Sequence, residues 1–271
     1  MAATLPDLET VTLSRGASNG AELRIELNRP ERMNAWDKQL GTDLLAAVEL
    51  AAADASVRAV TITGAGRAFS SGADLRAGFD PAPDGRPDVG TALRERYHPI
   101  IVGIRRMPKP VLAAVNGPAV GIGCSLALAC DMVLAAESAY FLLAFVNIGL
   151  APDGGSSIFV PARAGVGRAA EMAMLGERVP APTGRAWGLV DRLASDESFA
   201  DEVDALAERL ATGPTRAYAA AKEQLNARAY AGLEEQLELE ASLQVEMAGS
   251  ADFAEGVMAF LEKRPARFGG E

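Results

Sequence analysis

A single aspartate stands in an otherwise apolar stretch near the middle of the chain. In "NIGLAPDGGSS" (147–157), Asp153 follows a proline and precedes two glycines. Pro-Asp-Gly is a common turn sequence, because proline fixes φ, aspartate bonds its own backbone and glycine accepts positive φ. The alternative is chemical, since a carboxylate in apolar surroundings has a raised pKa that suits it to proton transfer. The segment by itself fits both interpretations.

Two glycine-rich segments have a form that suits anion binding. In "TITGAGRAFSSGADL" (61–75) and "AAVNGPAVGIGCSLALAC" (113–130), a strand-like run leads into a glycine-rich turn and then into a helical pattern. The first N–H groups of a helix lack partners, and the helix dipole adds partial positive charge there. Two such ends facing each other would bind an anion without any charged side chain.

Neither segment matches a nucleotide-binding or nucleophile motif. Phe69 stands where the third glycine of G-x-G-x-x-G belongs, and "GPAVGIG" has its glycines in the wrong order. The chain contains no G-x-x-x-x-G-K-[ST] sequence, and "GCSLA" lacks the last glycine of a G-x-S-x-G nucleophile elbow.

Composition narrows the possible classes further. The one histidine, His98, argues against metal sites and Ser-His-Asp triads, so no metal is expected. Cys124 and Cys130 have the spacing of neither a zinc site nor a redox pair. The net charge of −10 argues against nucleic acid as a partner. No apolar run reaches the roughly 18 residues of a membrane span, and the start lacks a signal peptide pattern. We therefore expect a cytoplasmic protein.

The elements that must position these segments alternate between strand and helix. Residues 23–28 and 57–64 are rich in apolar and β-branched residues and predict strands, whereas 37–54 has apolar residues at helical spacing. Short apolar runs, "PVLAAVNG" and "DMVLAAE", flank a predicted buried helix in "VGIGCSLALAC". This alternation predicts an α/β layer architecture. Residues 80–88 are predicted to form a surface loop.

The last third of the chain is predicted to be helical. From about residue 165 strand signals disappear, and apolar residues repeat at helical spacing over 199–210 and 253–261. Ser198 is a candidate N-cap for the first helix, and Ser250 or Asp252 for the second. The apolar faces of these helices could pack on the core or on another subunit.

Four motifs together resemble the crotonase, or enoyl-CoA hydratase/isomerase, superfamily. "FSSGADL" and "VNGPAVGIGCSLALACDMVLA" look like its two oxyanion-hole segments, and "LNRPERMNAW" and "EGVMAFLEKRPARF" like its opening and closing signatures. The resemblance implies a spiral of ββα units and acyl-CoA thioesters as substrates. It also implies a core over 1–200, a helical oligomerisation region over 201–271, and a homotrimer or dimer of trimers. No cofactor is implied beyond the coenzyme A of the substrate.

The same resemblance assigns the oxyanion donors. Carried over by position, they are the N–H groups of Ala73 and Ile122, which would stabilise the enolate oxygen of a thioester. Ile122 occupies a place that the family usually gives to glycine. Because a β-branched residue disfavours positive φ, we expect Ile122 to be helical, with its side chain narrowing the acyl pocket.

The acid–base residues differ from those of a hydratase. The two glutamates of the family's hydratases correspond to Ser125 and Phe145, neither of which is a suitable general base. Isomerases of the family, including those of phenylacetate breakdown, often carry their acid–base aspartate in a PD-x-G turn, and "APDGGSS" resembles that turn. Asp153 is therefore the candidate acid–base residue.

Further residues are candidates for substrate or coenzyme A binding. The resemblance implies the following set: Arg29, Arg32, Ser71, Gly72, Asp74, Leu75, Gly121, Ser125, Phe145, Phe260 and Lys263. Phe260 and Lys263 resemble residues that reach the coenzyme A site of a neighbouring subunit. Lys38 and Arg76 are further candidates for phosphate contacts, and Asn147 and His98 for the acyl pocket.

Three hypotheses follow from these residues. The first is an enzyme that isomerises a double bond or strained ring of an acyl-CoA through Asp153 and a backbone oxyanion hole. The second is an enoyl-CoA hydratase with atypical catalytic residues. The third is a coenzyme A-binding protein without catalysis. Acyl length and pathway depend on pocket shape, which the sequence alone does not determine.

Overall fold

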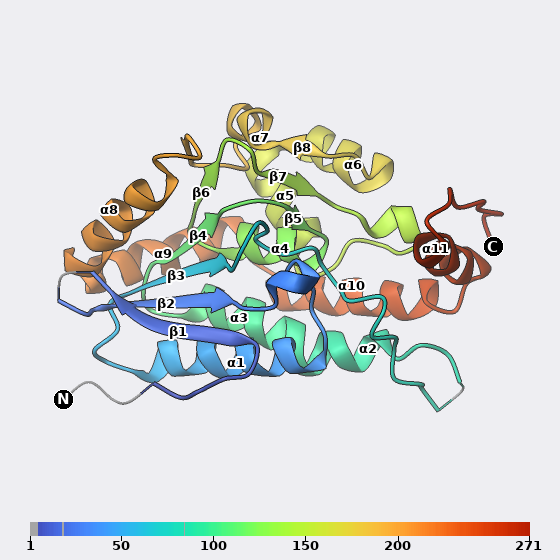
Figure 1. The fold of residues 1–271 in the computed structure, drawn as a ribbon, viewed down its shortest axis with the longest axis horizontal. Coiled ribbons are helices and arrows are strands. Elements are labelled where there is room, and N and C mark those ends of the chain that lie inside the picture. The colour runs from blue at the N-terminus through green and yellow to red at the C-terminus, as the bar shows by residue number, and fades with distance from the viewer. Residues whose placement is uncertain (1–4, 18, 84) are drawn as a thin grey trace.

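The apolar runs of the first half of the chain pair into one main sheet. A computed structural model describes residues 5–17, 19–83 and 85–271, and its main sheet has the order β1-β2-β3-β4-β6-β9 (Figure 1). β1 and β2 are antiparallel, and every other neighbouring pair is parallel. The strands of this sheet are β1 Val11–Gly16, β2 Glu22–Leu27, β3 Ala59–Gly64, β4 Val111–Val115, β6 Met132–Ala136 and β9 Arg192–Ala194.

A second, smaller sheet lies beside the glycine-rich turns. It consists of β5 Ala119–Val120, β7 Tyr140–Leu142 and β8 Val179–Pro180, with β7 in the centre. β5 is parallel to β7, and β8 is antiparallel to it. Because β5 immediately precedes the second glycine-rich turn, this sheet holds that turn in place.

Helices cover both faces of the main sheet. α1 and α3 contact each other, and α1 packs on β1 and β2, whereas α8 packs against β3, β2 and β6 (Figure 1). The helical elements are η1 Pro30–Arg32, α1 Lys38–Ala53, α2 Val89–Ala92, the π-helical turn η2 Leu93–Tyr97, α3 His98–Arg106, α4 Ile122–Ala129, η3 Phe145–Ile148, α5 Ser156–Ala164, α6 Val166–Leu175, α7 Ala181–Trp187, α8 Phe199–Thr212, α9 Thr215–Ala229, α10 Leu233–Met247 and α11 Ala251–Glu262.

The predicted elements of the first half are confirmed. The strand predictions correspond to β2 and β3, the helix prediction over 37–54 to α1, and the short buried helix to α4. Asp37 caps α1 by accepting a hydrogen bond from the N–H of Leu40 at 2.8 Å. The predicted loop over 80–88 carries no helix or strand among its described residues; Asp84 lies outside them.

The prediction that strands end near residue 165 is wrong. β8 and β9 lie beyond it, and β9 adds a parallel edge strand to the main sheet. Both are two or three residues long, too short for an alternating pattern, so only pairing with β7 and β6 defines them.

The helices α8 and α11 form as predicted. Ser250 caps α11 through its side chain, whereas Ser198 precedes α8 without a side-chain capping bond.

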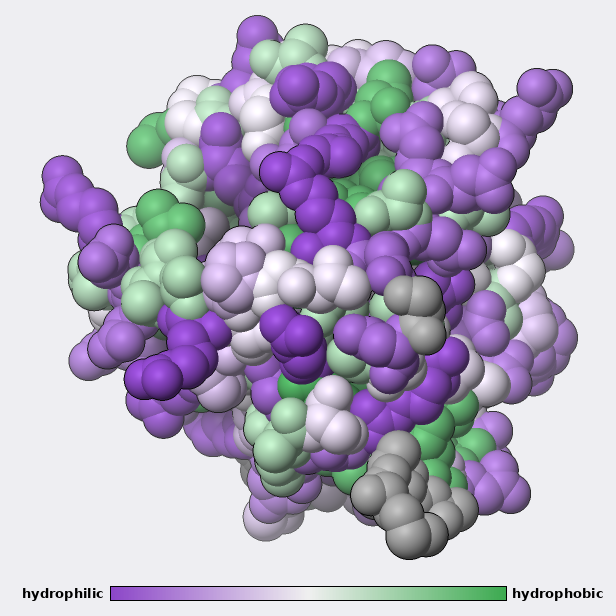
Figure 2. All heavy atoms as spheres, turned by 90° about the vertical axis from the view of Figure 1, so that its left-hand side faces the viewer, coloured by the Kyte–Doolittle hydropathy of each residue, from purple (hydrophilic) through white to green (hydrophobic). Residues whose placement is uncertain are grey.

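Apolar residues of the C-terminal helices pack against the rest of the same chain. Leu206 of α8 and Leu237 of α10 are 4% and 1% exposed and belong to the chain's own hydrophobic clusters. Figure 2, which shows the side of the molecule at the left of Figure 1, is mostly hydrophilic, with apolar residues in small separate groups. The Leu206 and Leu237 side chains themselves are therefore packed within the chain.

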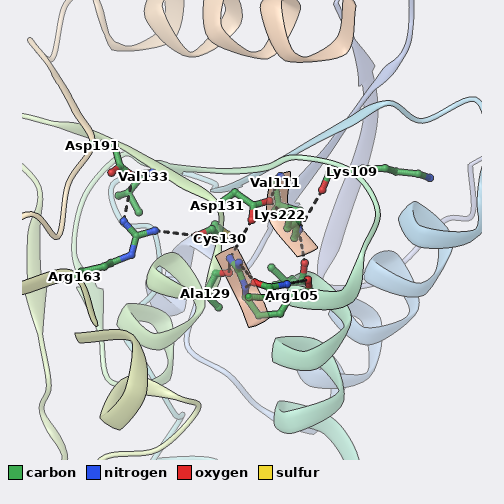
Figure 3. A network of polar contacts seen from close by, with 12 residues as sticks. Arg105, Lys109, Val111, Ala129, Cys130, Asp131, Val133, Arg163, Asp191 and Lys222 are labelled. Carbon is green, nitrogen blue, oxygen red and sulfur yellow. Dashed lines mark hydrogen bonds and ion pairs between the residues drawn. The ribbon is translucent and has the colours of Figure 1, made fainter. Parts of the chain in front are cut away.

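Asp131, at the start of β6, joins α3 and α9 to the sheet (Figure 3). One carboxylate oxygen accepts a bond from Arg105 at 3.0 Å. The other accepts the N–H of Val111 at 2.9 Å and lies 2.8 Å from the Lys222 ammonium. The Arg105 and Lys222 side chains are 5% and 6% exposed, so both cations depend on this carboxylate.

We expect Asp131→Ala to lower the free energy of unfolding by about 3–5 kcal/mol, because it leaves two buried cations without their counter-charge. Asp204, whose side chain is 63% exposed in its pair with Arg24, is the matched control. Asp204→Ala is expected to cost about 1 kcal/mol or less. Urea denaturation of both variants measures the difference, and equal losses would contradict the predicted role of Asp131.

The described helices include none with the length and apolar character of a membrane span. Within residues 5–17, 19–83 and 85–271, no three His, Cys, Asp or Glu side chains are grouped as metal ligands would be.

Candidate active site

The two glycine-rich turns lie side by side. Ser70 and Ala119 form a parallel bridge, in which the N–H of Ser70 donates to Pro118 and the N–H of Val120 donates to Ser70, both at 2.9 Å. Ala73 lies three residues after Ser70, and Ile122 lies three residues after Ala119, so they occupy equivalent positions on the two neighbouring segments.

Glycine is required where the two turns come closest. Gly72 has φ +89° and Gly121 has φ +53°, conformations that other residues rarely adopt. A Cβ on Gly72 would lie 3.0 Å from the Val120 carbonyl oxygen. The tight approach of these backbones brings the following residues, Ala73 and Ile122, to one place.

The N–H of Ala73 takes no part in the bridge to Trp36, and the N–H of Ile122 takes no part in the hydrogen bonds of its own helix. Ile122 is the first residue of α4, where an N–H has no intrahelical acceptor. Ala73 bridges Trp36 through the carbonyl of Gly72 and the N–H of Asp74, so its own N–H points away from Trp36. Ile122 is helical, as predicted, and 2% exposed.

A cavity of about 900 Å³ opens beside the two turns. Its walls come from the glycine-rich turns, α1, the α2–η2 region, η3 and the C-terminal helices. The residues that line it include Trp36, Lys38, Ser71, Gly72, Ala73, Asp74, Leu75, Asp80, Arg96, Tyr97, Gly121, Ile122, Phe145, Asn147, Asp153, Gln244, Phe260 and Arg264. A volume of this size suits a small-molecule ligand.

Asp153 lies in the wall of this cavity beside α4. The residue is 8% exposed, and its Oδ2 accepts a hydrogen bond from Gln244 at 2.9 Å. Its Oδ1 is buried and has no hydrogen-bond partner. Burial raises the pKa of the carboxyl well above its usual range; the charge of Glu240 adds to this, and the Gln244 bond opposes it. The site thus holds a carboxyl group with one uncommitted oxygen.

The turn that carries Asp153 is fastened to α4. Ser125 Oγ donates to the carbonyl oxygen of Asp153 at 2.7 Å. A Cβ on Gly154, which has φ +63°, would overlap the Ile122 side chain and lie 2.9 Å from Cβ of Ser125. The same short helix therefore supplies the N–H of Ile122 and supports the Asp153 turn.

Ser125 and Phe145 have different surroundings. Ser125 is fully buried, is not among the residues that line the cavity and bonds the Asp153 turn. Phe145 lines the cavity, close to Gly121.

The basic residues predicted to meet coenzyme A divide into two groups. Lys38 lines the cavity, whereas Arg29, Arg32, Arg76 and Lys263 do not. Arg29 forms ion pairs with Asp37 and Asp74 at 3.0 and 3.2 Å, so the structure uses its charge to hold the first turn. Arg32, Arg76 and Lys263 are exposed at the surface.

Phe260 lines the cavity of its own chain. The reason is the packing of α11: Gly256 sits against the backbone of Ile148, and a Cβ there would lie 2.6 Å from its Cα. α11 thereby folds back over η3. Asn147 also lines the cavity, whereas His98 is buried away from it, and burial lowers the pKa of His98 to about 4.

The sequence analysis missed Gln244, Glu240 and Tyr97. Tyr97 lies in the π-helical turn η2 and lines the cavity; burial and the nearby charge of Asp153 raise the pKa of its hydroxyl. Gln244 and Glu240 lie on α10 and are 1% and 2% exposed. Their four-residue spacing on the same helix face as buried Leu237 and Ala241 is a signal that could have pointed to them.

Comparisons with known proteins show the family to which the chain belongs. Residues 18–271 match the family model for enoyl-CoA hydratase/isomerase. A protein of Rhodobacter capsulatus named as a probable enoyl-CoA hydratase is 46% identical over 91% of this chain and 93% of its own length. The 1,2-epoxyphenylacetyl-CoA isomerase of Escherichia coli is 39% identical over 92% of this chain and 95% of its own.

A solved structure shows the same fold. The crystal structure of an enoyl-CoA hydratase from Mycobacterium avium subsp. paratuberculosis is 38% identical, with a TM-score of 0.87 over 97% of this chain and 99% of its own. The predicted α/β fold, with its spiral core and C-terminal helices, is thereby confirmed. The chain therefore belongs to the enoyl-CoA hydratase/isomerase family of the crotonase superfamily.

Proposed function

We propose that this protein isomerises an enoyl-CoA or a related ring acyl-CoA, with Asp153 as the acid–base residue and the N–H groups of Ala73 and Ile122 as the oxyanion hole. The observation that carries the proposal is the buried, unpartnered Oδ1 of Asp153 in the wall of the cavity that Ala73 and Ile122 also line. The isomerase named among the relatives supports the same class of reaction.

Double-bond migration needs only these groups. In a 3-enoyl thioester, ionised Asp153 takes a proton from C2, and the electrons of that C–H bond form a dienolate. The two N–H groups stabilise the negative charge on its oxygen. Asp153 then returns the proton to C4, which yields the conjugated 2-enoyl thioester and regenerates the carboxylate. The reaction has no net change in protons or electrons, so the proposal includes no separate cofactor.

Hydration is supported less well than isomerisation. It requires carboxylates that hold and deprotonate a water molecule, and the resemblance places Ser125 and Phe145 at the hydratase glutamate positions. Ser125 is buried behind the Asp153 turn, and Phe145 presents a phenyl ring to the cavity. A single carboxylate at Asp153 suffices for proton transfer between two carbons.

Coenzyme A is the proposed carrier of the acyl group. Lys38, Arg96 and Arg264 are cations in the cavity wall, and cations of this kind bind phosphates. Arg264 also pairs with Glu255 and Glu262, and Lys38 with the exposed Asp80. Arg96 and Arg264 were not among the residues predicted from sequence. They extend the proposed coenzyme A site to η2 and to the end of α11.

Two assays test the proposed function. The first follows conversion of 3-enoyl-CoA to 2-enoyl-CoA, and the second follows exchange of the C2 protons of a saturated acyl-CoA in deuterated water by NMR. Exchange together with isomerisation would support the proposal. Release of a 3-hydroxyacyl-CoA would favour the hydratase hypothesis, and binding without exchange would favour a coenzyme A-binding protein without catalysis.

The pH dependence of exchange follows from the buried carboxyl. Asp153 must be ionised to accept a proton, so activity is lost as the pH falls through its pKa. Because burial raises that pKa, we expect the midpoint of the loss well above the ordinary value of 3.8. A pH profile of C2 exchange measures it. A midpoint near 4 would contradict the assignment of Asp153 as the base.

We also propose a homotrimer or a dimer of trimers. Leu225 on α9 and Leu239 and Leu243 on α10 are 63%, 49% and 41% exposed, which leaves apolar surface on the C-terminal helices after the core is packed. Light scattering at micromolar concentration is expected to give a trimer or hexamer. A monomer would contradict the proposal.

A further inference from the structure

Three polar side chains of α10 contact the chain segment that carries Asp153. Gln236, Glu240 and Gln244 are four residues apart and share one face of the helix. Each forms hydrogen bonds with residues between 151 and 157. α10 is thus joined to a segment that is 79 to 93 residues away in sequence.

Glu240 holds the backbone directly after Asp153. Its Oε2 accepts the N–H of Gly155 at 2.7 Å, and its Oε1 accepts the N–H of Ser157 at 3.0 Å as well as the Ser157 hydroxyl. Gln236 donates to the same hydroxyl at 2.8 Å. These bonds satisfy N–H groups at the start of α5 that would otherwise be unpaired in a buried position.

Gln244 holds the carboxylate itself. Its Nε2 donates to the carbonyl oxygen of Ala151 at 2.6 Å and to Oδ2 of Asp153 at 2.9 Å. Because both neighbours are acceptors, the amide nitrogen must face them, which determines the orientation of the amide. Oδ2 is thereby occupied, and Oδ1 is the oxygen of Asp153 that lacks a partner.

We propose that Gln244 and Glu240 are positioning residues for the reaction at Asp153, with Gln244 binding Oδ2 so that Oδ1 transfers the proton, and Glu240 fixing the turn. The inference rests on the proposed function of Asp153. It gives α10 a role in catalysis in addition to its role in packing.

The two residues act on the charge of Asp153 in opposite directions. The Gln244 bond stabilises the ionised carboxylate and lowers its pKa, whereas the negative charge of Glu240 raises it. The hydroxyl of Tyr97 on η2 also interacts with the charge of Asp153, which raises the pKa of that hydroxyl. Substitution of Gln244 or Glu240 leaves Tyr97 unchanged. Removal of Gln244 or Glu240 should therefore shift the pH profile in opposite directions.

The test compares Gln244→Met and Glu240→Gln in the C2 exchange assay. Gln244→Met keeps the length of the side chain, and it also removes Oε1, which is buried without a partner. We expect the acidic limb of its profile to move up by on the order of one pH unit, with a slower maximal rate. For Glu240→Gln we expect a movement of similar size downwards.

Glu235→Gln is the matched control, because it removes a carboxylate from the exposed side of the same helix. It should leave both the limb and the rate unchanged. Folding is checked by thermal denaturation. If Glu240→Gln does not fold, Gln244→Met alone decides, since loss of the bond to Oδ2 predicts an upward shift in a folded protein.

Shifts of both variants in one direction, or no shift relative to the control, would overturn the inference, as would loss of folding in both. Failure of the proposed function itself has another signature. If Asp153→Asn retained full exchange, Asp153 would not be the base, whatever the α10 variants did.

Discussion

Asp153→Asn is expected to bind acyl-CoA about as well as the unchanged protein but to lose about 10²–10⁴ of its isomerisation rate. Asparagine has nearly the same size and serves turns as well as aspartate does. The asparagine can present its amide oxygen to Gln244 Nε2, which already donates to this position and to the carbonyl oxygen of Ala151. The substitution therefore removes the group that accepts and returns the proton and leaves the turn in place. A loss of this size corresponds to about 3–5 kcal/mol of activation free energy.

Calorimetry with an acyl-CoA and the C2 exchange assay separate binding from chemistry in this variant. Asp80→Asn is the matched control, because Asp80 lines the same cavity with a side chain that is 72% exposed. The control should retain its rate. If the structural turn were the only role of Asp153, Asp153→Asn would be nearly silent, and exchange at the unchanged rate would rule out the proposed base.

Ile122→Pro is expected to lower kcat by about 10²–10³, which is the usual effect of removing one oxyanion donor. Ile122 is the first residue of α4, where proline is well tolerated because the N–H has no intrahelical acceptor. The substitution therefore removes the N–H that we propose as an oxyanion donor while the helix keeps its hydrogen bonds. Backbone donors are otherwise difficult to delete by mutation.

Ile122→Ala distinguishes the donor from the side chain. Alanine keeps the N–H but removes the apolar group that narrows the cavity, so we expect a change in acyl preference and only a small loss of rate. Circular dichroism and thermal denaturation show whether both variants keep the fold. Equal rates for Ile122→Pro and Ile122→Ala would mean that the N–H does not stabilise the enolate.

The local sequence was sufficient for the elements that lead into the site. β2, β3, α1 and α4 follow from apolar spacing and β-branched content, because each is long enough, or bounded clearly enough, to show its own period. β8 and β9 were missed, since two or three residues carry no period and are strands only through pairing with β7 and β6.

Some candidate site residues could be predicted from sequence because the glycines before them determine their backbone positions. Glycines at Gly72 and Gly121 allow positive φ and close backbone contact, so the residues after them are placed by local geometry. Resemblance to the family then gave Ala73, Ile122 and Asp153. The resemblance also predicted that Ser125 and Arg29 bind substrate or coenzyme A. In the structure, Ser125 bonds the carbonyl oxygen of Asp153 and Arg29 pairs with Asp74.

Sequence alone therefore determined the layered fold, the two turns and a carboxylate in apolar surroundings. Tertiary structure alone decided which oxygen of Asp153 is hydrogen-bonded and that its pKa is raised. The physical reason is that both properties depend on groups distant in sequence: the amide of Gln244 lies 91 residues from Asp153, and the charge of Glu240 acts through space. Desolvation, which raises the pKa most, is a property of the packed cavity wall and has no local sequence signal.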